Sequence, residues 1–111
     1  MKVKSINRTA ITITPKQPYI DWANDFDDGI GYDGVHATTV LIPDSYGDLD
    51  FETYLKKIFK HVFEEQLESW MTDPDGWPPN RTYKMFKEWF NVLCSDMTWD
   101  YGDGNLEHDE Y

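Results

Sequence analysis

The spacing of apolar residues between positions 51 and 70 constrains the fold more than any other feature of the sequence. Large apolar side chains recur there every three or four residues, which is the period of an α-helix. They are Phe51, Tyr54, Leu55, Ile58, Phe59, Val62, Phe63, Leu67 and Trp70. Lys57, Lys60 and Glu64 fall on the opposite side. We therefore predict a long helix whose broad apolar face packs against a second layer of structure.

Shorter patterns on both sides of this helix predict that second layer. Alternating β-branched residues ended by prolines indicate strands, and three-four spacing indicates further helices. In chain order they predict a strand at 9–14, a helix at 17–26, a strand at 35–42, the long helix, a helix capped by Asn80 and a strand at 92–101. We expect an α+β two-layer domain, a small three-stranded sheet covered by helices in the order β-α-β-α-α-β. The sequence leaves open whether the sheet is mixed or antiparallel.

The last predicted strand has two unlike faces. Alternate residues of a strand point to opposite sides of a sheet. The larger side chains on one face are Leu93, Met97, Trp99 and Tyr101, and the smaller ones on the other are Val92, Cys94, Asp96, Thr98 and Asp100. We expect residues 1–101 to form a single globular domain and 102–111 to form an acidic C-terminal tail.

Acidic residues dominate the electrostatic character of the chain. The formal net charge is −11, and residues 21–54 contain nine acidic side chains and no Lys or Arg. Six more acids lie within residues 95–111. Since DNA and RNA are bound by cationic side chains, this charge opposes direct nucleic-acid binding. The charge favours a partner protein with a basic surface. It also leaves open that this protein itself imitates the nucleic-acid backbone, with carboxylates in place of phosphates.

The composition also bears on the cellular compartment and on cofactors. No apolar run approaches the roughly 20 residues that span a bilayer, and Cys94 is the single cysteine. We expect a cytoplasmic protein without membrane contact, an internal disulfide or a cofactor, present as a monomer or a small homo-oligomer.

Two clusters of acidic and histidine residues resemble metal sites in composition. The Asp25–Gly29 segment is rich in carboxylates, but its spacing does not match a calcium-binding loop, because an EF-hand requires glycine at position six and glutamate at position twelve. His61, Glu64 and Glu65 lie at helical spacing, but they are too few for a hydrolytic zinc centre. We predict neither a metal site nor a catalytic residue. A metal-assisted enzyme using His61, Glu64 or the aspartate loop is the alternative from a different class.

Aromatic residues are the most informative positive feature, at 16% of the chain. Eighteen such rings exceed what three strands and three helices are expected to hide, which suggests an exposed patch. Trp77 lies in a proline-rich turn and is our first candidate for a partner anchor; the alternative, slightly favoured, is that it folds back as a lid over the core. The candidate binding residues are Asp25, Asp27, Asp28, Asp33 and Trp77. Together they predict a small, non-enzymatic, acidic interaction module for a basic protein surface, with a nucleic-acid-mimicking inhibitor or immunity-type protein as the alternative.

Three segments of the chain resemble a group of short, acidic, uncharacterised bacterial proteins. The first combines Asn7-Arg-Thr-Ala10 with Pro15-Lys-Gln-Pro-Tyr19 and Trp22. The others are Leu41-Ile-Pro43, and Trp70 through Trp77-Pro-Pro-Asn-Arg81 with Phe86 and Trp89. The resemblance implies a compact intracellular protein and transfers no catalytic or ligand residue.

Overall fold

The computed structural model describes residues 3–26, 31–34, 36–44 and 50–110. These residues form five strands, three α-helices and one 3₁₀ turn. In order they are β1 (Lys4–Ser5), β2 (Arg8–Pro15), α1 (Gln17–Asn24), β3 (Thr38–Pro43), α2 (Phe51–Glu68), the 3₁₀ turn η1 (Pro74–Gly76), α3 (Tyr83–Trp89), β4 (Phe90–Ser95) and β5 (Trp99–Asp100).

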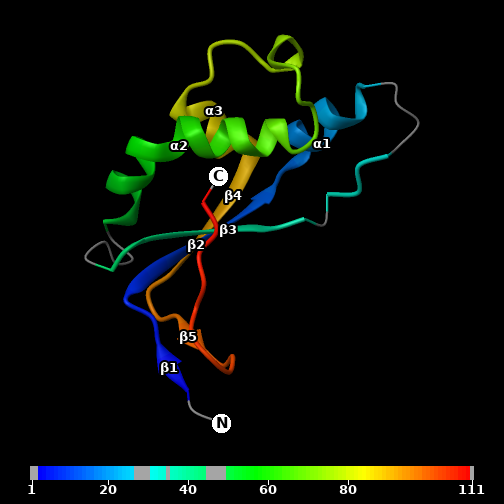
Figure 1. The fold of residues 1–111 in the computed structure, drawn as a ribbon. Helices are drawn as coiled ribbons and strands as arrows, with labels where there is room; N and C mark the ends of the chain where they lie inside the picture. Colours follow the sequence, from blue (N-terminus) through cyan, green and yellow to red (C-terminus); the bar gives the residue numbers. More distant parts are fainter. Residues whose placement is uncertain (1–2, 27–30, 35, 45–49, 111) are drawn as a thin grey trace.

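The centre of the fold is a three-stranded antiparallel sheet in the order β3-β2-β4. Its register aligns Ile11 with Val40 on one side and with Cys94 on the other. The α+β class, the three main strands and the three helices are therefore as predicted, and the sheet is antiparallel (Figure 1).

The three helices lie on one side of this sheet, and the core fills the space between the two layers (Figure 1). Residues of β2 whose side chains point toward the helices, such as Ile11 and Ile13, are buried completely or nearly so. From the helices, Tyr19, Phe63 and Phe86 meet them. Aromatic rings contact one another across the layers, and the centroids of Phe63 and Phe90 lie 5.4 Å apart in an edge-to-face arrangement. Much of the aromatic content of the sequence is used in this way.

The long helix is confirmed almost to its predicted ends. α2 runs from Phe51 to Glu68, and Leu55, Phe63 and Leu67 on its apolar face are fully buried. The N-cap residue is Asp50, although its side chain accepts no capping hydrogen bond. Packing of the apolar face, rather than capping, therefore stabilises this helix.

The predicted cap of the last helix is wrong. α3 begins at Tyr83, and its N-cap is Thr82, whose hydroxyl accepts a hydrogen bond from the Met85 amide at 3.1 Å. Asn80 has a φ of 56° and lies outside the helix. Asparagine tolerates this left-handed conformation better than most residues, so Asn80 turns the chain rather than starting the helix.

The predicted strand at 92–101 is divided in two. β4 ends at Ser95, and β5 pairs with β1 in a separate two-stranded ribbon that the sequence analysis missed. Residues 3–7 and 96–101, here called the terminal arm, project from the end of the sheet away from the helices (Figure 1). The molecule measures 47 × 29 × 24 Å along its principal axes, so it is clearly elongated.

No described helix combines the length and the apolar character needed to cross a membrane.

Candidate functional site

The clearest surface feature is a row of exposed large side chains that begins on β4 and continues along the terminal arm. We call it the apolar stripe, and its members are Leu93, Met97, Trp99 and Tyr101. Their exposed fractions are 67%, 65%, 50% and 60%. These four side chains are the larger-residue face of the predicted strand. The stripe is therefore an apolar surface that the rest of the fold leaves exposed to water.

The reason for this exposure lies in the sheet register. Val92 pairs with the buried Ile13 and points toward the helices, so Leu93 points to the opposite face of the sheet, which none of the described helices covers. In the arm, Trp99 is opposite Ser5, and neighbouring residues of a strand point to opposite faces. On β4, the large Leu93 thus lies on the uncovered side, and the smaller Val92 and Cys94 lie beneath the helices.

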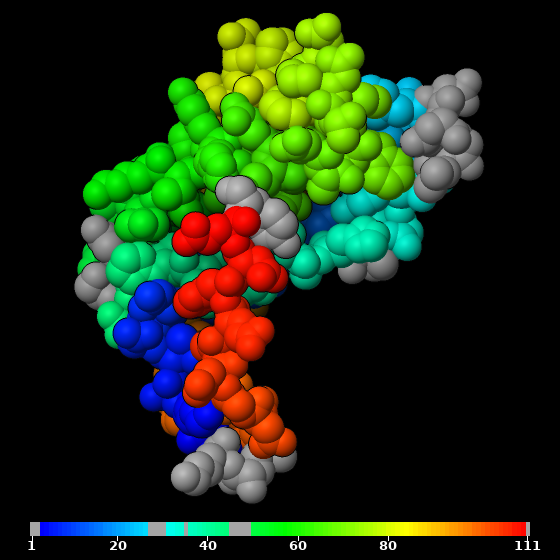
Figure 2. Space-filling view, in the orientation of Figure 1, coloured from blue at the N-terminus to red at the C-terminus, as the bar shows by residue number. Residues whose placement is uncertain are grey.

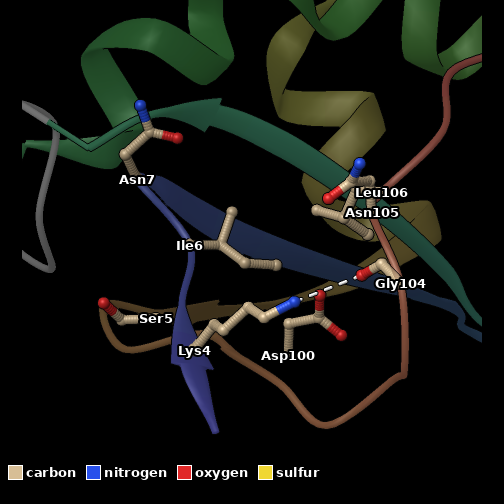
Figure 3. A pocket seen from close by; sticks show the side chains of 8 residues that line it. All are labelled: Lys4, Ser5, Ile6, Asn7, Asp100, Gly104, Asn105 and Leu106. Atoms are coloured by element: carbon tan, nitrogen blue, oxygen red, sulfur yellow. Dashed lines mark hydrogen bonds between the residues drawn. The ribbon is translucent and has the colours of Figure 1, made fainter. Parts of the chain in front are cut away.

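The other side of the arm is covered by the C-terminal segment. Lys4 is opposite Asp100, and its ammonium donates a hydrogen bond to the Gly104 carbonyl oxygen at 3.2 Å. Figure 3 shows Ile6 and Leu106 beside this contact, at the edge of a cavity of about 280 Å³. Figure 2 shows the C-terminal segment (red) lying alongside the N-terminal residues (blue). The arm consequently has one shielded face and one bare face.

The chain segment that carries most of the stripe is also rich in carboxylates. Residues 95–111 carry six acids and no Lys or Arg. Of these, Asp96 and Asp103 are exposed, whereas Asp100 is half-buried. The combination of exposed apolar side chains with an acidic margin is the arrangement found where a protein interface has an apolar centre and a polar rim.

The aspartates predicted as binding residues lie elsewhere. Asp25 follows α1 directly and is exposed, and Asp33 is exposed with its carboxylate 3.8 Å from Nε2 of His36. Asp27 and Asp28 lie outside the described residues. The structure does not bring Asp25 or Asp33 to the terminal arm, so they belong to a second acidic region beside α1.

Trp77 is half-buried and packs against the core. Its indole N–H donates to the Met71 carbonyl at 2.7 Å, and the guanidinium of Arg81 lies 5.5 Å from its ring centroid. These contacts agree with the alternative in which Trp77 folds back as a lid over the core. A role of Trp77 in binding a partner stays a prediction.

The fragment considered as a metal site makes ordinary surface contacts. Nδ1 of His61 lies 3.5 Å from a Glu65 carboxylate oxygen, and both side chains are largely exposed. Glu64 instead accepts a hydrogen bond from Nη2 of Arg81 at 2.9 Å. Within the described part of the chain, no group of three or more His, Cys, Asp or Glu is arranged to hold a metal ion.

A second hollow, here called the aromatic pocket, lies between α1, the end of α2 and the start of β3. Its volume is about 430 Å³, and its lining residues include the half-buried Tyr32 and Trp70 together with Tyr19, of which only 2% is exposed. Burial raises the pKa of Tyr19 to about 12 and also raises the pKa of Tyr32. Both phenols are therefore neutral at physiological pH.

Sequence reasoning found the members of the stripe but did not identify them as a surface. The signal was the size difference between the two faces of the last strand, since the smaller face fits against the helices. Which face is bare depends on the pairing with β2, and that pairing is visible only in the tertiary structure. The aromatic pocket left no local signal, because its residues come from four separate segments.

The fold and these surfaces define an acidic α+β protein with one uncovered sheet face and a projecting arm. No family model, curated protein or solved structure matches the chain. The resemblance to short acidic bacterial proteins consequently stays a prediction.

Proposed function

We propose that this protein is a small, non-enzymatic interaction module that binds a basic protein surface through the apolar stripe. The observation that carries the proposal is the exposure of Trp99 and Tyr101, which are 50% and 60% accessible on the bare face of the arm. Tryptophan and tyrosine are enriched among residues that dominate binding energy, because they bury much apolar area and lose few rotamers.

The negative charge of the protein determines which partners it selects. The net charge of −11 steers a basic protein toward this surface and repels acidic proteins and nucleic acids. Asp96 is exposed and directly precedes Met97 of the stripe, so it contributes to the rim of the contact. Asp25 and Asp33 add to the long-range field from the other end of the molecule. Affinity then comes from the aromatic side chains, and the association rate from the carboxylates.

The test compares capture from native cell lysate by the wild-type chain and by a Trp99→Ala/Tyr101→Ala variant. We expect the wild type to retain a basic protein at low salt and to lose it at high salt, since exposed charges are screened. The variant should retain at least tenfold less. Binding of the purified partner should then be measured by calorimetry at several salt concentrations.

The matched control is Thr53→Ala/Thr72→Ala, which also truncates two exposed uncharged side chains but outside the terminal arm. It should bind the partner as the wild type does. Equal capture by the wild type and the arm variant would refute the stripe as the binding surface. If nucleic acid displaces the captured protein, the partner is a nucleic-acid-binding protein and the mimicry alternative is favoured.

A further inference from the structure

The aromatic pocket carries an inference that is independent of the terminal arm. We propose that it binds a small organic ammonium ion, of which a methylated amine such as choline is the simplest probe. Its volume of about 430 Å³ lies within the range of small-molecule sites. Neither the apolar stripe nor the proposed protein partner is needed for this binding.

The arrangement of the rings is the first argument. Tyr32 meets Tyr19 with centroids 5.5 Å apart and an interplanar angle of 66°, and it meets Trp70 at 5.1 Å and 77°. Because these rings are steeply inclined to one another, they form adjoining walls rather than a parallel stack. Aromatic faces are electronegative and attract cations, and quaternary ammonium groups are recognised by walls of this kind.

The rings are also held in place by hydrogen bonds to the backbone. The phenol of Tyr19 donates to the Gln66 carbonyl at 2.5 Å, and the indole of Trp70 donates to the Ala23 carbonyl at 2.7 Å. Two of the three walls are therefore fixed before a ligand arrives. A preorganised site loses less conformational entropy on binding.

The polar groups of the pocket favour a positive ligand. The Gln66 side-chain amide donates to the Thr38 hydroxyl at 2.9 Å, which leaves the other atom of that amide, a carbonyl oxygen, as an acceptor. The Ser69 hydroxyl donates to the Gln66 main-chain carbonyl at 2.7 Å, and its lone pairs are acceptors too. The described lining contains neither Lys nor Arg, and its one basic side chain, His36, has its Nε2 3.8 Å from the Asp33 carboxylate.

The surrounding field acts in the same direction. Asp33 directly follows Tyr32 in the chain, and the whole protein carries a formal charge of −11. An anion entering the pocket would meet this field with His36 as the only basic side chain among the described lining residues. A neutral apolar molecule would gain nothing from the field. An organic cation gains from both the rings and the charge.

The experiment titrates the whole protein with choline and, separately, with 3,3-dimethyl-1-butanol, which has the same shape without the charge. We expect saturable binding of one choline per chain by calorimetry, at least about tenfold tighter than the uncharged alcohol, because cation–π attraction is lost with the charge. Equal affinities for choline and the uncharged alcohol would show that the pocket recognises only apolar shape, and they would overturn the proposal. Absence of saturable choline binding would also overturn the proposal.

Two variants of Tyr32 locate the site. Tyr32→Phe keeps the aromatic wall and should bind choline within about twofold of the wild type, whereas Tyr32→Leu removes the wall and should bind at least about tenfold more weakly. Tyr101→Leu, which makes the same change on the terminal arm, should have no effect. Unchanged binding by Tyr32→Leu would overturn the assignment.

A measurement on the wild type covers the case in which Tyr32→Leu does not fold. In a nitrogen-edited NMR titration, choline should shift the indole N–H resonance of Trp70 saturably and leave that of Trp99 in place. Shifts confined to Trp99 would contradict the aromatic pocket as the site. They would leave the proposed role of the terminal arm untouched.

Discussion

Individual tryptophans in this protein have unlike roles because their indole groups meet different surroundings. Trp77 donates a hydrogen bond to the Met71 carbonyl and packs on the core, whereas Trp99 is half-exposed on the arm. Truncating the first should create a cavity and leave a buried carbonyl without its donor. Truncating the second removes surface that water already reaches.

We therefore expect Trp77→Ala to lower the free energy of unfolding by about 2–4 kcal/mol. Trp99→Ala should change it by less than about 1 kcal/mol. Urea denaturation followed by far-UV circular dichroism measures both values. Similar losses in the two variants would refute the distinction between lid and surface residue.

Two buried or half-buried tyrosines should make the protein sensitive to alkali. The pKa of both Tyr19 and Tyr83 is raised to about 12, in each case chiefly by burial, from an ordinary value of 10.0. A raised folded-state pKa contributes stability that is complete below the unfolded pKa and is lost above it. Unfolding free energy should therefore fall as the pH rises from 10 to 12.

Tyr19→Phe tests the origin of that loss. The variant should be about 1 kcal/mol less stable near pH 7, because the bond to the Gln66 carbonyl is gone. Its stability should then decline less steeply between pH 10 and pH 12 than that of the wild type. Urea midpoints measured across this range would contradict the assignment if the two slopes were equal.

At the scale of elements, α2 shows how one amphipathic helix organises the fold. Its fully buried residues span four turns, from Leu55 to Leu67, and they pack on the sheet and on α3. Its last turn also supplies the Gln66 carbonyl, which accepts hydrogen bonds from Tyr19 and Ser69. One helix thus joins the core to the aromatic pocket.

A pair of neighbouring substitutions tests which face of α2 is buried. Ile58→Asp places a charge on the face that packs against the core, and we expect a loss of about 2–4 kcal/mol in unfolding free energy. Lys57→Asp introduces the same residue on the exposed face and should cost about 1 kcal/mol or less, mainly through helix propensity. Thermal melting compares them, and equal melting temperatures would exclude the assigned faces.

For the whole molecule, the decisive property is its elongation. The Cα radius of gyration is 15.8 Å, whereas a compact chain of this length has a value near 13 Å. The terminal arm accounts for the difference, because β1 and β5 extend beyond the sheet (Figure 1). The stripe is accessible only while the arm stays extended.

Small-angle X-ray scattering at several concentrations tests this shape. We expect a radius of gyration of about 16 Å or slightly more, once the hydration layer is included, with an elongated distance distribution. A value near 13 Å would mean that the arm folds back on the sheet. A value that rises with concentration would instead reveal self-association, and the stripe would then be covered by a second copy of the chain.

The sequence by itself determined the elements with strong local patterns. Helix α2, the strand around Ile11 and Ile13, and the proline-rich turn near Trp77 were predicted because periodicity and backbone chemistry act over a few residues. The acidic charge and its segregation into blocks were equally plain. Cap positions were less certain, as Thr82 and Asn80 show, because both residues suit a helix start by composition.

Only the tertiary structure decided which surfaces are bare. Alternation in residues 92–101 defined two faces, but the pairing of Val92 with Ile13 was needed to show that Leu93 points away from the helices. The break between β4 and β5 likewise depends on the pairing of β5 with Lys4 and Ser5, almost a hundred residues away. The aromatic pocket brings Tyr19, Tyr32 and Trp70 together in the same way. Such contacts depend on how the whole chain packs, and no local pattern encodes them.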